Sequence, residues 1–502
     1  MKKFTAGCVK VMSRWLPDAF IFAVILTIIV FIAAMPASGV GPLKMAMVWG
    51  DGVWNLLAFS MQMALVVVTG TAFATAPIIK KALNSIARLA KTPAQGVALV
   101  VIVSGIANFL NWGFGLIVGA LLGRAVARQL ENVDYRMLIA AGYSGFVIWH
   151  AGMSGSIPLN MNTGGLLQPF TTKNLDFVNL VGANNLESFV EKTAEDGSLE
   201  YTWNAIQSTG GTVTGLIPTT ETIFSIWNLI MIVAVIAITA ILFAIAHPKK
   251  EDTFVVDPAI LQDVEREYPA PVTPAEKIEN SPILAWVVGL CGLVWIVVFF
   301  FIKADVGGVT YGRGLNGLNL NSVNFIFLIL GLLGHGTPIR YVHAVIDAAK
   351  GAAGVILQFP FYAGIQAMMI FAGPSGTSLA AVISNFFVSI SNTVTFPLWT
   401  FLAAGIVNFF VPSGGGQWSV QGPIMMPAGL ALGVKPAVTG MAIAWGDQWT
   451  NMIQPFWALP ALGAAGLGAK DIMGYCVLTL LVMAVVACGG FLLVGALGIS
   501  AV

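Results

Sequence analysis

The chain is built from apolar runs long enough to cross a membrane. Residues 222–246, for example, contain no charged side chain, and runs of this kind recur along the chain. A lipid bilayer offers no water to backbone N–H and C=O groups, so such runs must form helices. The composition agrees, since 57% of the 502 residues are hydrophobic and 9% are charged. The sequence therefore predicts an all-α polytopic membrane protein.

From the continuous runs we predict about nine transmembrane helices. The first follows a basic amino terminus and is interpreted as a retained span, with a cleaved signal peptide as the alternative. An interfacial helix is expected over 40–57. The predicted spans are 15–34, 58–79, 137–158, 222–246, 282–302, 321–338, 353–373, 437–457 and 471–500.

Two further apolar segments are interrupted by glycine-rich tips and are predicted to be re-entrant hairpins. The first, 93–128, turns at Asn111-Trp112-Gly113-Phe114-Gly115. The second, 396–433, turns at Ser413-Gly414-Gly415-Gly416-Gln417-Trp418. Unwound backbone at membrane depth is tolerated where it lines a cavity, so these tips form the predicted transport site. The alternatives are two complete spans for the first segment and an extramembrane turn for the second.

The two halves of the chain echo each other at an offset of about 300 residues, as the broken helices of inverted-repeat transporters do. Gln62 corresponds to Gln358, and Asn108 to Asn408. The first hairpin would enter from the cytoplasm and the second from outside. We therefore predict two opposed hairpins in an inverted repeat, 1–246 and 282–502, joined by a cytoplasmic linker at 247–281. An extracytoplasmic segment, 160–218, belongs to the first repeat, and chance similarity between apolar segments is the alternative.

The distribution of basic residues sets the orientation. Of the 24 Lys and Arg residues, this topology places outside only Lys44, Lys173, Lys192, Lys303, Arg313 and Lys435. The positive-inside rule then puts the amino terminus in the cytoplasm. A net charge of +1 indicates neither nucleic acid nor an acidic partner, so the expected surroundings are the lipid bilayer.

The residues around the second tip carry a resemblance. The run VPSGGGQWSVQGPIMMPA, with SNTVTFPLW before it and AWGDQWTNMIQPFW after it, resembles the bacterial short-chain fatty acid transporter family, a branch of the ion-transporter superfamily. The similarity covers nearly the whole chain. It implies secondary active uptake of butyrate, acetoacetate or similar monocarboxylates across the bacterial inner membrane. It also implies a homodimer, each subunit having a scaffold domain and an elevator-type transport domain.

A short monocarboxylate needs hydrogen-bond donors for its head and an apolar cover for its tail. The predicted carboxylate cradle consists of Ser413, Gly414, Gly415, Gly416 and Gln417, where bare N–H groups and a helix N-terminus favour an anion. The predicted cover comes from Trp112, Gly113, Phe114 and Trp418. Tryptophans of membrane proteins also form interfacial belts, which is the alternative for both tryptophans.

For coupling we predict Na⁺, and no other cofactor. Neutral oxygens at broken helices suit a hard monovalent cation. The candidate sites are Asn108 with Ser154, and Asn408 with Thr450 and Asn451; interhelical hydrogen bonding is the alternative role. Asp447 lies inside a span, where an ionisable residue carries a proton or binds a cation. His150 occupies the corresponding position of the first half, and a neutral imidazole near a helix end is the alternative for it.

Other classes of protein fit less well. An enzyme needs a nucleophile with a base, or clustered metal ligands. The four histidines are scattered, and no H-x-x-x-H or C-x-x-C spacing occurs. A proton-coupled carrier of another small organic anion and a channel are the remaining alternatives, and flux measurements separate them.

Overall fold

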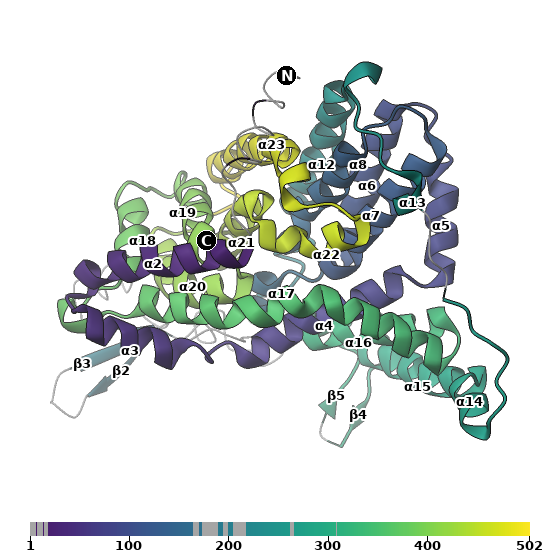
Figure 1. The fold of residues 1–502 in the computed structure, drawn as a ribbon. Helices are drawn as coiled ribbons and strands as arrows, with labels where there is room; N and C mark the ends of the chain where they lie inside the picture. The colour runs from purple at the N-terminus through teal and green to yellow at the C-terminus, as the bar shows by residue number, and fades with distance from the viewer. Residues whose placement is uncertain are drawn as a thin grey trace.

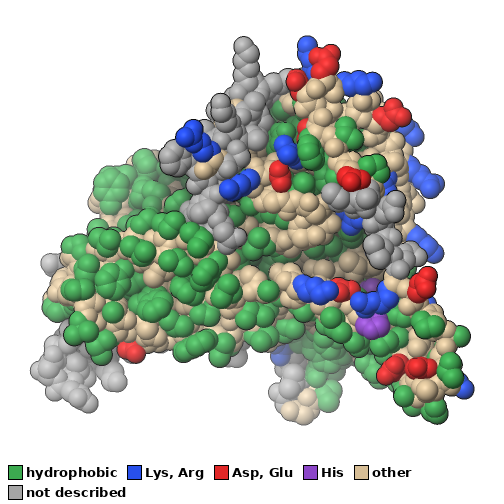
Figure 2. Space-filling model, in the orientation of Figure 1, with side chains coloured by type: hydrophobic (Ala, Val, Ile, Leu, Met, Phe, Trp, Pro, Cys, Tyr) green, Lys and Arg blue, Asp and Glu red, His purple; other side chains and the backbone are tan. Residues whose placement is uncertain are grey.

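The computed structural model describes residues 7, 14, 19–163, 170–172, 189–193, 199–203, 217–261, 266–307 and 309–501. It is mostly helical (78%), as the apolar runs predict. Figure 2 shows apolar side chains spread over the face made by α2 and the neighbouring part of α17, while charged side chains gather at the opposite end. A surface of this kind suits a protein that is surrounded by lipid over part of its height.

The helices form two groups (Figure 1). A lower layer contains α2 (Ala19–Ser38), α3 (Pro42–Gly52), α4 (Leu57–Ala74), α15 (Pro282–Phe301), α16 (Leu320–His335) and α17 (Pro338–Ile370). An upper group contains α6 (Pro93–Leu110), α7 (Trp112–Gln129), α8 (Tyr135–Ser144), α12 (Ile226–Ala246), α19 (Phe396–Phe410), α21 (Pro436–Thr450), α22 (Pro455–Ala465) and α23 (Ala469–Ala496). The two groups meet where α4 packs against α7, and α17 against α22.

Both predicted hairpins are helix–break–helix units. The first breaks at Asn111 between α6 and α7, and the second breaks at 411–413 between α19 and α20 (Gly414–Ala431). One detail of the second prediction is wrong, because α20 begins at Gly414, the first of the three glycines. The glycines therefore form the first turn of a helix, and the unwound residues are 411–413.

Two of the predicted continuous spans are broken. Span 137–158 consists of α8, the 3-10 helix η1 (Gly145–Ala151), a turn, and α9 (Ser156–Thr163). Span 437–457 consists of α21, the short 3-10 helix η6 (Asn451–Ile453), and α22. Both breaks fall where the ion-site prediction placed broken helices, at Ser154 and at Thr450–Asn451.

Other boundaries differ from the predicted ones. Span 58–79 ends at Ala74, and Pro77 starts a separate helix, α5 (Pro77–Ala87). Span 353–373 is the second part of the 33-residue helix α17. A further helix, α18 (Leu379–Ser389), precedes the second hairpin. A proline starts α5 and α17, and the Ser378 side chain caps the start of α18.

By length and composition, six helices in the described part of the chain could cross a membrane. They are α4, α6, α12, α15 with the preceding α14 (Pro274–Glu279), α17 and α23. Helices α2 and α3 would add a seventh as a pair bent by 119°, which matches the interfacial helix predicted after the first span.

The all-α prediction is wrong in two small regions. Strands β1 (Phe170–Thr172), β2 (Phe189–Thr193) and β3 (Leu199–Trp203) form an antiparallel sheet in the order β1-β3-β2. Strands β4 (Asp305–Val306) and β5 (Val309–Thr310) form a hairpin. The LEYTW sequence of β3 has the alternation of a strand. The rest of the predicted 160–218 segment lies largely outside the described residues.

The linker contacts both groups of helices. Its first part continues from α12 through two short helices, η3 (Lys250–Asp252) and α13 (Pro258–Leu261). There the Asp134 carboxylate accepts a hydrogen bond from the Phe254 N–H at 2.9 Å, and the Arg136 guanidinium lies 3.9 Å from the Phe254 ring. Its last part contacts α17, where the Arg340 guanidinium lies 5.1 Å from the Tyr268 ring.

Candidate functional site

The first hairpin tip is held by the broken helix that follows it. Trp112, the first residue of α7, is 1% exposed. Its N–H donates to Ser154 Oγ at 3.0 Å, and the Asn111 side chain caps the helix by accepting from the Phe114 N–H at 2.9 Å. The first N–H groups of a helix have no partner within it, so these two side chains fix the tip.

The aromatic residues of this tip have different surroundings. The Trp112 ring meets the Trp457 ring edge-on, with centroids 5.2 Å apart, and the Trp149 ring at 6.0 Å. The Phe114 ring instead stacks on Phe73 of α4, at 5.3 Å. Trp112 therefore joins an aromatic cluster of the upper group, whereas Phe114 anchors the hairpin to the lower layer.

The second tip packs closely against the first half of the chain. A Cβ on Gly414 would lie 2.7 Å from His150 Nε2, and one on Gly415 would lie 2.5 Å from Phe59 Cζ. Both distances are too short for real carbon contacts, so close packing requires glycine at these positions. At the same tip Ser413 Oγ accepts from the Gly416 N–H at 3.3 Å.

The two remaining cradle and cover residues are buried. Gln417 donates from Nε2 to the Ala404 carbonyl at 2.8 Å and to Gln421 Oε1 at 2.7 Å. Trp418 is 0% exposed. The belt interpretation is therefore wrong for Trp112 and Trp418, because a belt tryptophan lies at the lipid surface.

Helix α4 connects the two tips. A Cβ on Gly113 would lie 2.8 Å from the Val66 carbonyl carbon, and Gly415 packs on Phe59. Phe59 and Val66 are two turns apart on this helix, about 10 Å along its axis. The two hairpin tips therefore pack against the same face of α4.

The second predicted ion site is assembled. Asn408 Nδ2 lies 2.7 Å from the Asp447 carbonyl oxygen, 2.7 Å from Thr450 Oγ1 and 2.9 Å from Asn451 Oδ1. An amide nitrogen has two hydrogens for these three acceptors. The other end of the same amide, Asn408 Oδ1, is buried without a hydrogen-bond partner.

The first predicted ion site is only partly assembled. Asn108 donates from Nδ2 to the Ser104 carbonyl at 2.8 Å, and its Oδ1 is buried without a partner. Ser154 uses its hydroxyl oxygen to accept from the Trp112 N–H, as described above. The two residues border the same tip, and no hydrogen bond between them is formed in the described structure.

His150 and Asp447 meet across the two halves. His150 Nδ1 lies 2.8 Å from Asp447 Oδ1, and the Ile157 N–H donates to His150 Nε2 at 2.9 Å. A nitrogen that accepts from an N–H carries no proton, so this imidazole is neutral and donates from Nδ1. This geometry agrees with the interpretation of His150 as a neutral side chain beside a helix end, since α9 begins at Ser156; the role of His150 stays a prediction.

Comparison with known proteins identifies one family over most of the chain. Residues 1–176 and 203–494 match the family described as short chain fatty acid transporter. A protein of Escherichia coli (strain K12) is 41% identical over 95% of this chain and 96% of its own length. One of Haemophilus influenzae is 41% identical over 93% and 94%. Both are named "Putative short-chain fatty acid transporter".

The chain belongs to the short-chain fatty acid transporter family. It is therefore a membrane transporter and not an enzyme. The resemblance carried by the second tip and its flanks is confirmed.

Two transporters of known structure are similar to this chain at lower sequence identity. The YdaH transporter of Alcanivorax borkumensis is 16% identical, with a TM-score of 0.49 over 96% of this chain and 99% of that chain. MtrF of Neisseria gonorrhoeae is 15% identical, with a TM-score of 0.47 over 97% and 96%. Both similarities are too weak to extend a mechanism to this chain.

Sequence reasoning missed several polar residues around the site of this transporter. Gln448 Oε1 accepts from the N–H groups of His150 and Ala151, at 2.9 and 3.0 Å. Ser156 Oγ lies 3.0 Å from His150 Nε2. Gln448 follows Asp447 directly in the sequence, so its place in a glycine-containing polar run was the available signal; Ser156 offered none.

Proposed function

We propose that the protein is a Na⁺-coupled secondary transporter that takes up short-chain fatty acids and similar small monocarboxylates, such as butyrate and acetoacetate. The observation that carries the coupling is a set of buried side-chain oxygens without partners: Asn108 Oδ1, Asn408 Oδ1 and Asp447 Oδ2. Leaving a buried acceptor unsatisfied costs about 1–3 kcal/mol. A dehydrated cation is a suitable partner for such oxygens.

The stronger of the two proposed Na⁺ sites is in the second half. Three oxygens, from Asp447, Thr450 and Asn451, converge on the Asn408 amide nitrogen within 2.9 Å. A half-turn of this amide exchanges its nitrogen for Oδ1 and brings four oxygens together. Asn108 with Ser154 is proposed as the weaker site, since Ser154 already caps Trp112.

The glycine run has two proposed roles. The close contacts of Gly414 and Gly415 support a packing role, which brings the second tip against His150 and Phe59. Carboxylate binding by the N–H groups of the run stays a prediction.

We further propose an inverted repeat with an elevator-type movement. The support is the double occurrence of one element order, in which a hairpin is followed by a broken helix and a long apolar helix. The upper group would be the transport domain and the lower layer the scaffold of a homodimer. The protein would lie in the bacterial inner membrane with its amino terminus in the cytoplasm.

A proton-coupled carrier is the second candidate. The direct contact between His150 and Asp447, both fully buried, favours it because Gly414 of the second tip packs against His150. Asp447→Asn separates the two mechanisms. A Na⁺ carrier keeps weakened Na⁺-dependent uptake through the amide oxygen, whereas a proton carrier loses gradient-driven accumulation and keeps substrate exchange.

The test is uptake of labelled butyrate into proteoliposomes, with Na⁺ and pH gradients imposed separately. We expect saturable uptake that depends on an inward Na⁺ gradient and is inhibited by unlabelled acetoacetate. Uptake that is unaffected by removal of Na⁺ and driven by an inward proton gradient would replace the Na⁺ mechanism by the second candidate. Flux that does not saturate with butyrate would indicate a channel.

A further inference from the structure

Helix α3 presents an outward face that no described part of the chain covers. Its inward face contains Met45 and Gly52, both buried, and Trp49, whose ring lies 6.1 Å from that of Phe361 in α17. On the outer side, exposed residues alternate at four and three positions, the spacing of a coiled-coil seam. This seam consists of Leu43 (78% exposed), Met47 (53%), Gly50 and, just beyond the helix, Trp54 (65%). Figure 1 shows α3 at the edge of the lower layer, so the seam is open to a neighbour.

Two charged side chains flank the seam. Lys44 and Asp51 are both exposed and are two helical turns apart, about 10 Å along the axis, so they lie on the same side of it. Within the described residues neither forms an ion pair, and the Lys44 Nζ lies 5.8 Å from the Phe371 ring. Their order opposes the dipole of α3, because Lys44 is near the positive amino-terminal end and Asp51 near the negative carboxyl-terminal end. The stability of the helix itself therefore does not explain these charges.

Neither lipid nor water suits this face by itself. Gly52 packs on Ala367 of α17, within the stretch 351–370, which contains no charged residue. An unpaired Asp51 carboxylate facing lipid beside that stretch is costly. In water the cost falls instead on the apolar seam, which would stay hydrated. A partner that covers the seam and supplies the opposite charges removes both costs.

We propose that α3 pairs with the α3 of a second copy in antiparallel orientation, with Lys44 of each copy against Asp51 of the other. This inference rests on the homodimer of the proposed function and assigns its contact surface. Residues that flank an antiparallel seam on the same side face each other across the two helices. A twofold axis makes the contact self-complementary, so one interface contains the Lys44–Asp51 pair twice.

Two further features of α3 fit this pairing. Ala46 and Gly50 are exposed one turn apart, and a Cβ on Gly50 would meet nothing within 4 Å. Small residues at this spacing let two helices approach closely in a membrane. In the antiparallel pair each charge also lies beside the end of the partner helix whose dipole has the opposite sign. The arrangement that is unfavourable in one copy is therefore favourable in two.

The first experiment reverses the charges. Lys44→Glu and Asp51→Lys should each raise the Kd of the purified dimer at least tenfold, because each places two pairs of like charges in the interface. The variant with both reversals should dimerise as the wild type does. Lys303→Glu and Asp305→Lys, at exposed residues in and beside β4, are the matched controls and should leave the Kd unchanged. Light scattering of the detergent-solubilised protein measures the dimer.

The second experiment tests the crossed pairing. Lys44→Glu and Asp51→Lys chains are co-expressed with different affinity tags. In the mixed dimer every Lys44–Asp51 position again holds opposite charges, so mixed dimers should form in large excess over dimers of either variant alone. Random assembly of the two variants would overturn the proposal.

A thiol crosslink locates the contact in the membrane. Met47→Cys, in a chain whose four cysteines are replaced by alanine, should give a covalent dimer with a short bifunctional thiol reagent. Ile230→Cys, at a residue of α12 that is 63% exposed, is the control and should stay uncrosslinked.

The outcomes separate this interface from the proposed transport. Monomeric wild-type protein would overturn the interface together with the homodimer, whether or not it takes up butyrate. A dimer with an unchanged Kd in both single charge variants, or without a crosslink at position 47, would overturn the α3 contact alone and leave α3 facing lipid. The expected charge dependence in a protein that takes up no monocarboxylate would support the interface and refute the transport function.

Discussion

His150 Nδ1 lies 2.8 Å from Asp447 Oδ1, and both side chains are fully buried. The contact joins η1 of the first half to α21 of the second, directly beside the point where Gly414 reaches His150. A carboxylate buried at this depth needs its donor. The pair therefore joins the two halves beside the second tip.

The first prediction concerns the stability of this pair. His150→Ala should lower the free energy of unfolding by about 1–3 kcal/mol, because it removes the closer of the two donors to the buried Asp447 carboxylate and leaves only the Asn451 amide, at 3.3 Å. The double variant His150→Ala/Asp447→Asn should recover part of that loss. Thermal melting of the purified protein in detergent measures both, and a single variant as stable as wild type would contradict the assignment.

The second prediction concerns the proposed ion site. Asn408→Ala removes the amide at the convergence of three oxygens. We expect the Na⁺ concentration for half-maximal butyrate uptake to rise about tenfold. A tenfold change corresponds to the loss of one ligand interaction about as strong as a hydrogen bond. Asn280→Ala, at an exposed amide of the linker, is the matched control. An unchanged Na⁺ dependence in Asn408→Ala would exclude this site.

The third prediction separates packing from carboxylate binding at the glycine run. Gly415→Val should abolish uptake, because its side chain would collide with the Phe59 ring and β-branching restricts it further. If packing is the role of this glycine, Phe59→Ala in the same chain should restore part of the uptake. No recovery in the double variant, with both proteins present in the membrane at wild-type amounts, would instead favour the carboxylate cradle.

The fourth prediction concerns the cap on the first tip. Ser154→Ala leaves the buried Trp112 N–H without an acceptor and should cost about 1–3 kcal/mol in the free energy of unfolding. Ser154→Thr keeps the oxygen and should cost much less. Melting of the two variants side by side provides the check, and equal losses would point to a steric cause.

Most helices and break points could be predicted from the sequence, because they depend on the local pattern of residues. Apolar runs ended by Pro, Gly or Lys placed most spans, and the offset between the halves aligned Asn108 with Asn408 and His150 with Asp447. The direct contact between His150 and Asp447 could not be predicted from the sequence. Residues that align between two halves need not be in contact in the folded chain.

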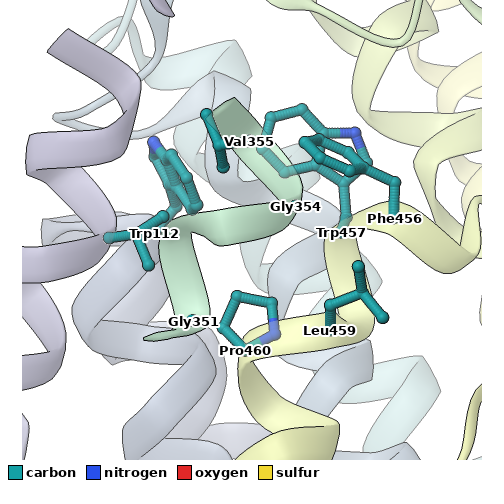
Figure 3. A pocket seen from close by; sticks show the side chains of 9 residues that line it. Trp112, Gly351, Gly354, Val355, Phe456, Trp457, Leu459 and Pro460 are labelled. Carbon is teal, nitrogen blue, oxygen red and sulfur yellow. The ribbon is translucent and has the colours of Figure 1, made fainter. Parts of the chain in front are cut away.

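The aromatic cluster at the first tip was beyond the sequence for a similar reason. Trp112 and Trp457 belong to two helices whose packing alone brings their rings together (Figure 3). The role of Phe114 was also missed, because its neighbour Phe73 is in α4 and aromatic residues at a tip suit a ligand or a helix equally well. The start of α20 at Gly414 differs from the prediction because three glycines locally favour unwound backbone, and packing overrides that preference.

The central claim is that cation and carboxylate cross the membrane together. The most direct measurement is simultaneous entry of labelled sodium and labelled butyrate into proteoliposomes containing the wild-type protein. Coupling between two ligands is reciprocal, so we predict that butyrate accelerates sodium entry in a fixed ratio to its own uptake. In Asn408→Ala the same acceleration should require about ten times more Na⁺. Sodium entry that does not respond to butyrate, while butyrate itself enters, would contradict the account.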